Sequence, residues 1–428
     1  MTSASEPELL LAQARRLAQD GDLGALGTFA RVLELRPDCT EARIFLAGVA
    51  MANGQPGQAL VQLRLACASE PDNPHLAKSL ATAAFAAGLP NEACESLQRA
   101  LAQAPYLYEG HLLQGKILER QGDRPGATRA YFRAVSRAQI AEQWLSHEGI
   151  PAHLRTDVLH AMDFVRVGRQ EILGSLLDPL RERHGGQALL RVEAALAAYL
   201  GMVPVTPDDP RQRPKFLYFP GLPDTPWFSR ADFPWISQLE AAHESIHREA
   251  SAVLDDQSAL TPFLEFGARD RPEDFLAGTG GTPRWDAFFF YRHGQAYPDN
   301  QRRCPATSAV LEQLPLVRIA DHAPEICFSV LAPGTRILPH HGVTNVRVVV
   351  HLPLIVPPDC ALQVGGEVRA WRSGECLAFD DTFLHEAWNR STQTRVILLM
   401  DAWNPHLTDP ERDAMRELIE GIGEFHRG

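Results

Sequence analysis

A period of 34 residues constrains the N-terminal third of this chain more than any other feature of the sequence. Four separate columns of proline, glycine or other small residues keep this one period. They are Pro37, Pro71 and Pro105; Gly54, Gly88 and Gly122; Ala25, Ala59, Ala93 and Ala127; and Ala47, Ala81 and Gly115. Self-similarity at a fixed period of this length predicts a stack of repeated structural units.

Each unit is expected to be a pair of helices. Small side chains allow the two helices to approach closely, which accounts for the alanine columns. The glycine column lies where the first helix should end in a left-handed cap. The proline column lies after the second helix, because proline is tolerated at a helix start and not inside a helix. We therefore predict about four helix pairs over residues 3–139, within an N-terminal domain that spans residues 1–139.

This pattern resembles the tetratricopeptide repeat in its period and in its small positions. The resemblance implies a helical solenoid whose concave groove binds a peptide or a protein. A spacer or a module for self-association is the alternative. The sequence names neither the ligand of the groove nor the oligomeric state.

Residues 140–210 are expected to form a helical connector, although the period of 34 residues stops there. We read helices in the segments 142–151, 154–185 and 187–201. The polar, proline-rich segment 206–214 then predicts a domain boundary. The third domain of the chain accordingly spans residues 211–428.

From residue 215 onward, short β-rich runs separated by turns replace the helical pattern. The clearest expected strands lie within 325–334, 345–356, 361–364, 367–371, 376–381 and 395–403. Gly365 and Gly366 separate two of these runs, which is typical of a two-residue β-hairpin. Several short strands at this spacing predict a sandwich or jelly roll. The expected fold class is therefore an α-helical solenoid followed by a β-domain.

Ionisable side chains interrupt two of these expected strands. The pleat puts Arg347, Val349 and His351 on one face of their strand, while valine and leucine occupy the other face. Arg395 likewise shares a face with Ile397, Leu399 and Asp401. An arginine that points into a core is costly unless an anion meets it. The pattern therefore indicates an anion-binding site inside the β-domain.

Two histidines are candidate metal ligands. His340 follows a turn rich in proline and glycine, and His385 lies between two expected strands. Histidines from separate strands can converge on one cation inside a jelly roll. The usual facial triad has a carboxylate two residues after the first histidine, but that position is Gly342. From the residues alone, either a metal has two protein ligands plus water, or there is no metal.

Four segments in the second half resemble the aspartyl/asparaginyl β-hydroxylase family. They are FPGLPDTPWF, CPAT, FSVLAPGTRILPHHGVTNVRVVVHLPLIVP and GECLAFDDTFLHEAWNRSTQTRVILLMDAWNP, which occur in this order between residue 215 and about residue 412. The resemblance implies a double-stranded β-helix that binds Fe(II) through two histidines, with 2-oxoglutarate as co-substrate and dioxygen as oxidant. Members of the family also lack the carboxylate of the facial triad, and in this chain Gly342 occupies its position.

The resemblance also implies a role for individual residues. His340 and His385 match the iron ligands, and Asp381 matches an acid that would hold an iron-bound water. Arg395 and Ser329 match the pair that holds the distal carboxylate of 2-oxoglutarate. The remaining matches are His351, near the metal-chelating end of 2-oxoglutarate, and Arg347, on the same pocket face.

Val349 departs from the family pattern. Other members have a second arginine there, which helps to hold an acidic substrate, so this chain lacks one cation of that pocket. Iron and 2-oxoglutarate are therefore better supported than an aspartyl substrate. We expect His293, His322 and His406 to be surface or capping residues. The tryptophans Trp371, Trp388 and Trp403 are expected in the core, and Asp380 is expected to cap a turn.

Composition limits the class of partner and the compartment. The formal net charge of −12 gives no general support for nucleic-acid binding. The N-terminus does not read as a signal peptide, and no apolar stretch is long enough to span a membrane. Seven scattered cysteines without a C-x-x-C pair favour free thiols. We therefore expect a soluble cytoplasmic protein.

The sequence leads to one main functional hypothesis and two alternatives. The main hypothesis is an Fe(II)/2-oxoglutarate-dependent hydroxylase that acts on a peptide or protein side chain recruited by the repeats. One alternative is a hydroxylase for a small molecule or an acyl chain. The other is a repeat scaffold whose β-domain binds 2-oxoglutarate without turnover.

Overall fold

The chain forms two compact units, Met1–Gln170 and Glu171–Arg427. A computed structural model describes residues 5–265, 267, 271–279 and 281–427. The boundaries predicted from the sequence at residues 139/140 and 210/211 stay predictions.

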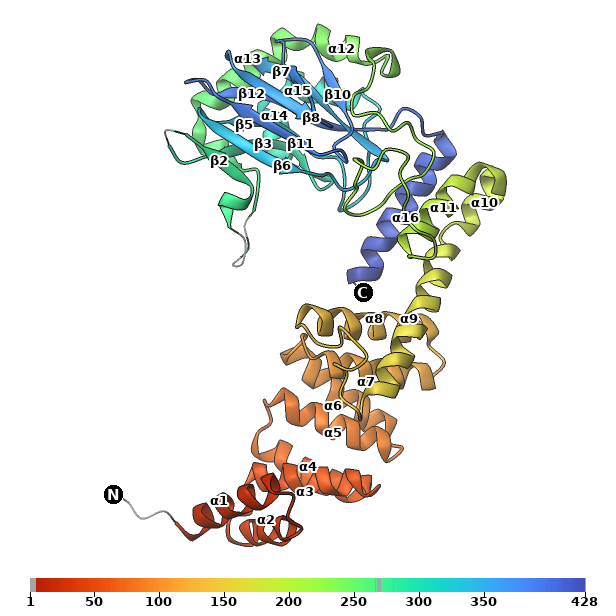
Figure 1. Ribbon diagram of the computed structural model, residues 1–428, viewed down its shortest axis with the longest axis vertical. Helices are drawn as coiled ribbons and strands as arrows, with labels where there is room; N and C mark the ends of the chain where they lie inside the picture. Colours follow the sequence, from red (N-terminus) through yellow and green to blue (C-terminus); the bar gives the residue numbers. More distant parts are fainter. Residues whose placement is uncertain (1–4, 266, 268–270, 280, 428) are drawn as a thin grey trace. The chain divides into compact units, whose positions relative to one another are not determined.

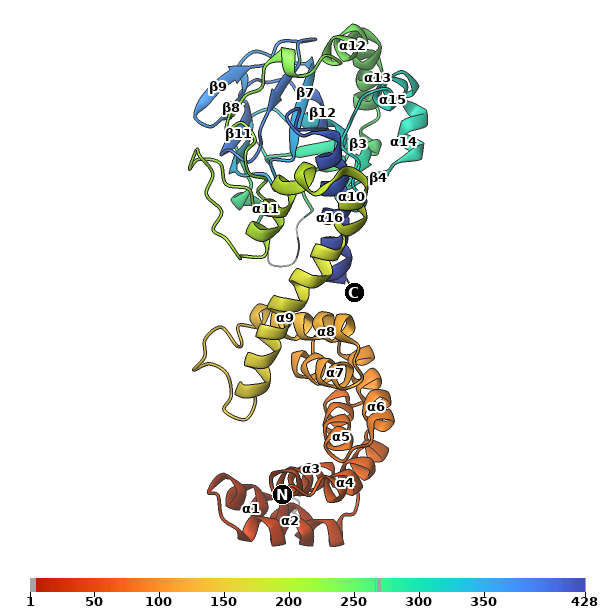
Figure 2. The same ribbon diagram turned by 90° about the vertical axis from the view of Figure 1, so that its right-hand side faces the viewer.

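The first unit is a stack of helix pairs (Figure 1). Its helices are α1 (Glu6–Gln19), α2 (Gly24–Leu35), α3 (Thr40–Ala52), α4 (Pro56–Ser69), α5 (Pro74–Ala86), α6 (Pro90–Gln103), α7 (Tyr108–Arg120) and α8 (Arg124–Ile140). Each odd-numbered helix packs on the helix that follows it, as α7 packs on α8. Figure 2 shows that α1 to α8 follow one curved stack, so the unit has a concave side. The predicted solenoid of about four helix pairs is confirmed.

The repeated columns occupy the positions that their chemistry requires. Gly54, Gly88 and Gly122 each follow the first helix of a pair and have φ between 69° and 79°, the left-handed conformation that glycine adopts without steric penalty. The alanine column on the second helices is buried at every position, with exposures of 0–2%. These alanines allow the close helix contacts that hold each pair together.

The segment 142–151 is not a helix, which corrects the prediction made from its sequence. It is a series of turns and bends, with Glu142 and Trp144 at positive φ. Trp144 and Ile150 are nonetheless buried, and Trp144 packs edge to face against Tyr108 with 5.0 Å between ring centroids. These contacts with the last helix pair hold the segment in an irregular path. The long helix α9 (Arg155–Ser175) follows it.

The second unit contains helices around two β-sheets. The helices are α10 (Asp178–His184), α11 (Leu190–Tyr199), α12 (Ile236–Ala241), α13 (His243–Asp255), α14 (Pro298–Arg303), α15 (Pro305–Glu312) and α16 (Asp409–Arg427). Short 3₁₀ helices span Gly186–Leu189, Arg230–Asp232, Gln257–Ala259 and Pro272–Asp274. Within the described regions of the chain, no helix is both long enough and apolar enough to cross a bilayer.

Both sheets are antiparallel, and their strand orders contain crossovers. The larger sheet has the order β1-β3-β5-β12-β7-β10, with β4 paired to β3, and the smaller has the order β2-β6-β11-β8-β9. The strands are β1 (Thr261–Pro262), β2 (Leu276–Gly278), β3 (Trp285–Arg292), β4 (Gln295–Ala296), β5 (Ile326–Leu331), β6 (Thr335–His340), β7 (Arg347–Ile355), β8 (Cys360–Val364), β9 (Glu367–Ala370), β10 (Leu377–Phe379), β11 (His385–Asn389) and β12 (Arg395–Trp403). This arrangement is compatible with the predicted jelly roll.

The strands expected from the sequence are present as β5, β7, β8, β9, β10 and β12. Gly365 and Gly366 connect β8 to β9 with φ of 58° and 90°, as the hairpin prediction requires. The strands β3, β6 and β11 were not among the expected ones. β3 is rich in aromatic residues and lacks the alternation of a half-buried strand, while β6 and β11 are short and mix polar with apolar residues.

The larger sheet separates two environments. One face packs against α12, α13 and α15 and forms the main core, which includes Val348, Val350 and Leu352 (Figure 1). The other face of the same strands carries Val349 and Leu399 and contacts side chains of the smaller sheet. The predicted division of β7 and β12 into an apolar face and a face with ionisable groups is therefore confirmed.

Replacing Gly115 with alanine is expected to destabilise the last helix pair. A Cβ at this position would overlap with the ring of Tyr131, which is fully buried. Such overpacking costs about 1–3 kcal/mol. Gly48 is the matched control, because it is also inside a first helix but has open space at its Cβ, so alanine there should stabilise by about 0.5–1 kcal/mol. Amide hydrogen exchange in α3, α7 and α8 measures both effects, and equal behaviour of the two variants would contradict this packing.

Candidate functional site

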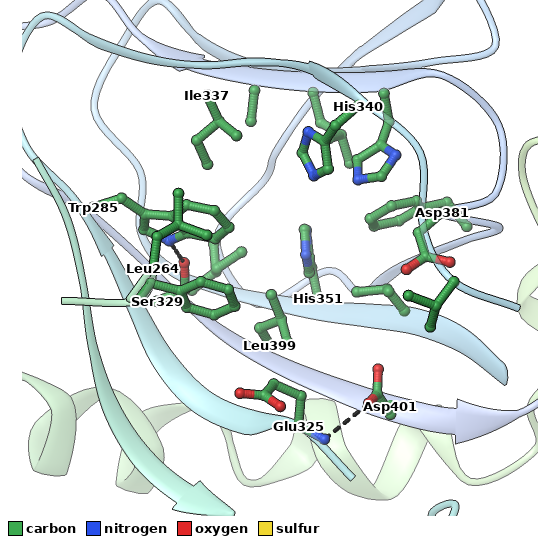
Figure 3. Close-up of a pocket in the computed structure, with 18 of the residues that line it drawn as sticks. Leu264, Trp285, Glu325, Ser329, Ile337, His340, His351, Asp381, Leu399 and Asp401 are labelled. Atoms are coloured by element: carbon green, nitrogen blue, oxygen red, sulfur yellow. Dashed lines mark hydrogen bonds between the residues drawn. The ribbon is translucent and has the colours of Figure 1, made fainter. Parts of the chain in front are cut away.

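A cavity of about 510 Å³ lies between the two sheets of the second unit. Residues at alternate positions of β7 and β12 form one wall, and residues of β6, β8 and β11 form the other. Figure 3 shows His340, His351 and Asp381 directed into this space, with Ser329 and Trp285 to one side. Every site residue predicted from the sequence lines this one cavity, namely Ser329, His340, Arg347, His351, Asp381, His385 and Arg395.

His340 and His385 are direct neighbours across paired strands. His340 is the last residue of β6 and His385 the first of β11, and the two are partners in the antiparallel register. Their ring centroids are 4.1 Å apart. The register shifts between His385 and Ala387, and such a bulge re-aims a side chain at the edge of a pair. Both histidines therefore lie at strand ends, on two separate strands, which is the arrangement that the sequence analysis considered for a shared cation.

The two imidazoles present the same nitrogen to the cavity. Nδ1 of His340 lies 2.8 Å from the carbonyl oxygen of Leu338, and Nδ1 of His385 lies 3.0 Å from that of Phe383. A proton on each Nδ1 leaves the Nε2 lone pair free, which is the arrangement that metal-binding histidines use. Burial lowers the pKa of His340, and burial together with His340 lowers the pKa of His385 to about 3. Both rings are thus neutral near pH 7.

Asp381 fills the place that a side chain at position 342 would take. A Cβ added to Gly342 would overlap with the carboxylate of Asp381, and the Gly342 N–H donates a hydrogen bond of 2.6 Å to the Asp381 carbonyl. The Oδ1 atom of Asp381 is buried and has no hydrogen-bond partner. Burial raises the pKa of this carboxyl. An acid group with an unsatisfied oxygen therefore stands beside the two histidines.

Arg395 is the buried cation that the sequence predicted. Its side chain is 1% exposed, and no carboxylate among the described residues pairs with it. One guanidinium nitrogen donates to the backbone oxygen and to the hydroxyl of Ser329 at 3.2 and 3.3 Å, while Nε has no partner. The guanidinium carbon lies 5.0 Å from the centroid of the Trp371 ring. Burial lowers the pKa of Arg395 to about 10, so it is still charged at pH 7.

Two tryptophans beside Arg395 donate hydrogen bonds to Ser329 and His351 and so determine which protons these two residues can offer to a ligand. The Trp285 indole N–H donates to the Ser329 hydroxyl at 2.8 Å, so this oxygen accepts from both Trp285 and Arg395 and its own proton is available to a further acceptor. The Trp371 indole N–H donates to Nδ1 of His351 at 3.3 Å, which places the imidazole proton on Nε2. Ser329, His351 and Arg395 therefore all offer donors to one anion.

Arg347 differs from Arg395 because carboxylates already surround it. One of its nitrogens donates to Asp401 at 2.6 Å, and another lies 3.4 Å from Asp381. The Asp401 carboxylate also accepts a hydrogen bond of 2.8 Å from the backbone of Glu325. Arg347 thus lies between the carboxylates of Asp381 and Asp401. Its predicted role in binding a co-substrate stays a prediction.

The structure adds residues to the site that the sequence did not single out. Trp285 and Glu325 received no role, and Trp371 was expected only in the core. His293 and His322 line the cavity too. His293 is exposed, as the sequence predicted, with 67% of its side chain accessible, whereas His322 is half-buried. The sequence carries no signal for the two tryptophans, because their role depends on hydrogen bonds to Ser329 and His351, which are distant from them in the chain. Asp380 does cap a turn, since it accepts bonds from the Thr382 amide and hydroxyl.

These residues fit a metal ion and an organic acid. Within the described ranges, no group of three or more His, Cys, Asp or Glu side chains could hold a metal ion. Two neutral histidines with free Nε2 atoms and a nearby acid with an unsatisfied oxygen suit a cation that keeps water ligands. The unpaired Arg395, with its planar fork of donors, suits a carboxylate.

Replacing Gly342 with alanine is expected to destabilise the second unit by about 1–3 kcal/mol, because the new methyl group would displace the Asp381 carboxylate. The double variant Gly342→Ala/Asp381→Ala should recover most of this loss, since the overlap is removed. Gly281→Ala is the control, because nothing lies within 4 Å of its Cβ. Thermal unfolding is measured for the wild type, both single variants Gly342→Ala and Asp381→Ala, the double variant and the control. Additive effects of the two substitutions would show that these residues do not share one space.

Comparison with known proteins agrees with the division of the chain. The family model for aspartyl/asparaginyl beta-hydroxylase matches residues 240–405, and a tetratricopeptide repeat model matches residues 17–83. A crystal structure of the MamA protein aligns with 40% of this chain and 94% of its own, with 21% identity and a TM-score of 0.30.

Curated relatives match about half of this chain. Aspartate beta-hydroxylase domain-containing protein 2 of Mus musculus is 34% identical over 207 residues, which are 48% of this chain and 58% of that protein. Aspartate beta-hydroxylase domain-containing protein 1 of Homo sapiens is 36% identical over 208 residues, 48% of this chain and 51% of that protein. The human aspartyl/asparaginyl beta-hydroxylase is 31% identical over 46% of this chain and 25% of its own length. The chain thus spans little more than half the length of these relatives at most, and it carries tetratricopeptide repeats in its N-terminal region and an aspartyl/asparaginyl β-hydroxylase domain in its C-terminal region.

Proposed function

We propose that the second unit is an Fe(II)/2-oxoglutarate-dependent dioxygenase that hydroxylates a C–H bond. The observation that carries the proposal is a buried arginine, without an acidic partner among the described residues, in the same cavity as two adjacent neutral histidines. A buried charge without a partner is costly, so this arrangement favours an anionic ligand. The site is not arranged for acyl or phosphoryl transfer, because no nucleophile with an adjacent base occurs among the described residues that line the cavity.

His340 and His385 would hold Fe(II), and Asp381 would accept a hydrogen bond from a water on the metal. Arg395 and Ser329 would bind the distal carboxylate of 2-oxoglutarate, with His351 donating to the same ligand. When bound, iron and dioxygen supply the oxidation that converts 2-oxoglutarate to succinate and carbon dioxide and a C–H bond to C–OH. The protein positions the reactants and excludes water through the apolar walls of the cavity.

The repeats would recruit a peptide or protein substrate. A hollow on the first unit is lined by the apolar residues Ile44, Met51, Leu63 and Leu112, together with the ion pairs Lys78–Glu109 and Lys116–Asp157. Mixed apolar and paired polar groups of this kind suit an extended peptide better than a lipid chain, since both backbone and side chains find partners. This feature favours a polypeptide substrate over a free small molecule or an acyl chain.

Wild-type protein is expected to form succinate from 2-oxoglutarate only when Fe(II) is present. His340→Ala and His385→Ala should each lose this activity and bind Fe(II) or Mn(II) at least about tenfold more weakly, because one of two protein ligands is gone. His341→Ala is the matched control, since Nδ1 of His341 is bonded to the Thr382 carbonyl and the residue is not among those that line the cavity. Metal affinity is measured by calorimetry. Undiminished metal binding in both ligand variants would exclude this site, and a metal-loaded protein that never forms succinate would favour a non-catalytic scaffold.

Arg395→Gln is expected to weaken 2-oxoglutarate binding while metal affinity changes little. Loss of a charge-assisted contact in a buried site costs roughly 2–5 kcal/mol. Arg395→Lys should restore only a small fraction of the affinity, because an ammonium group cannot reproduce the planar fork. Titration of 2-oxoglutarate into the Mn(II)-loaded protein measures the effect. Equal affinity in wild type and Arg395→Gln would remove Arg395 from the site.

A further inference from the structure

Acidic groups outnumber arginines around the cavity. The acidic lining residues are Glu265, Asp321, Glu325, Asp381 and Asp401, and the arginines are Arg292, Arg347 and Arg395. Asp321 is paired with Arg427 at 3.0 Å, which leaves four lining acids for the three arginines. Fe(II) and a 2-oxoglutarate dianion would cancel one another in charge, so an excess of one acid would remain after both had bound. The space left for a substrate is therefore electronegative when Glu325 is ionised.

Two of these arginines, Arg347 and Arg292, already have acidic partners. Arg347 pairs with Asp401 at 2.6 Å and approaches Asp381. Arg292 pairs with Glu265 at 2.7 Å and lies 4.0 Å from Glu325. Neither guanidinium is available to a substrate carboxylate unless it gives up an existing ion pair. Position 349, which faces the cavity between Arg347 and His351, supplies a buried valine and no charge.

Among the acids that line the cavity, Glu325 has the most distant arginine partner. Its side chain is 17% exposed, its arginine contact is the one at 4.0 Å, and Nδ1 of His293 lies 3.4 Å from its carboxylate. Its carboxylate accepts a 3.1 Å hydrogen bond from the backbone of His293. Burial raises the pKa of Glu325 to about 7, and the neighbouring Asp401 adds to the rise. A cation at this carboxylate would relieve both effects.

Apolar side chains form much of the cavity wall. They are Phe263, Leu264, Trp285, Ile337, Val349, Ile397 and Leu399. Figure 3 shows Leu399 between His351 and the pair Glu325 and Asp401, which lie on the side of the cavity away from His340. A ligand that extends from the histidines to Glu325 would thus pass aliphatic and aromatic surface before it meets an acid.

We propose that the substrate group taken by this cavity is a basic side chain, a lysine or arginine of a polypeptide, whose aliphatic stem lies at the metal site and whose cationic end meets Glu325. This inference rests on the proposed function and names its substrate class. A long basic side chain combines an apolar stem with a charged end, which matches the order of the walls. An aspartyl side chain is too short to reach beyond the apolar region and would find no unpaired cation there among the described residues. Arg284, another candidate partner for a substrate acid, pairs with Asp286 at 2.8 Å and is 60% exposed.

The test uses full-length protein loaded with Mn(II) and 2-oxoglutarate without oxygen, so that binding is measured apart from turnover. The probes are the peptides acetyl-Ala-Ala-X-Ala-Ala-amide, with X as lysine, arginine, glutamine, norleucine or aspartate. We expect the lysine or arginine peptide to bind at least about tenfold more tightly than the aspartate peptide, a difference of roughly 1.4 kcal/mol. The norleucine peptide should bind with intermediate affinity, because it keeps the stem and lacks the charge.

Glu325→Gln separates the charge from the shape of the cavity. We expect this variant to lose most of the preference for lysine over norleucine and to bind 2-oxoglutarate as the wild type does. Glu367→Gln is the matched control, since Glu367 is an exposed acid on β9 outside the cavity lining. Tighter binding of the aspartate peptide, no binding of either basic peptide, or an unchanged lysine preference in Glu325→Gln would each overturn the proposal. If the Mn(II)-loaded wild type did not bind 2-oxoglutarate, that result would instead contradict the proposed function itself.

Discussion

The antiparallel pairing of β7 with β12 is the constraint on which both the core and the site of the second unit depend. His351 is opposite Leu399 and Val349 is opposite Asp401 in this register, so one face of the pair carries every ionisable group and the other face is apolar. A shift by one residue would put Arg395 and Arg347 into the main core and expose the valines to the cavity. The large apolar core therefore fixes the position of the charged groups, which could not hold that register by themselves.

The buried charged side chains on this face differ in how far a group of opposite charge neutralises them. Arg347 and Asp401 neutralise one another, and Asp381 shares the same guanidinium. Glu325 is partly compensated and has a raised pKa. Arg395 has donors and an aromatic ring around it, but no acid among the described residues. Natural proteins rarely retain an unpaired buried charge without a ligand for it. The unequal compensation thus distinguishes two regions of one cavity: the region beside Ser329, which we propose binds an anion, and the region beside Glu325, where acidic groups are in excess.

Much of this organisation could be predicted from the sequence, because it depends on local spacing. The period of 34 residues determines the helix pairs, and alternation along β7 and β12 places Arg347, His351 and Arg395 on the cavity side. What could not be predicted depends on contacts between distant segments. The exclusion of a side chain at Gly342 by Asp381 is one example, and the partners of Arg347 are another. The irregular path of 142–151 was mispredicted because Trp144 and Ile150 are buried against the last repeat, which overrides the helical pattern.

The central claim is that His340, His385 and Arg395 form one site for Fe(II) and 2-oxoglutarate. The most direct measurement is an anaerobic titration of 2-oxoglutarate into Fe(II)-loaded protein, followed by visible absorption, because a 2-oxo acid chelated to Fe(II) through its oxo and carboxylate oxygens gives a charge-transfer band. The account predicts a saturable band that reaches one equivalent of 2-oxoglutarate per bound iron. An iron-loaded protein that binds 2-oxoglutarate without this band, or does not bind it at all, would contradict the account.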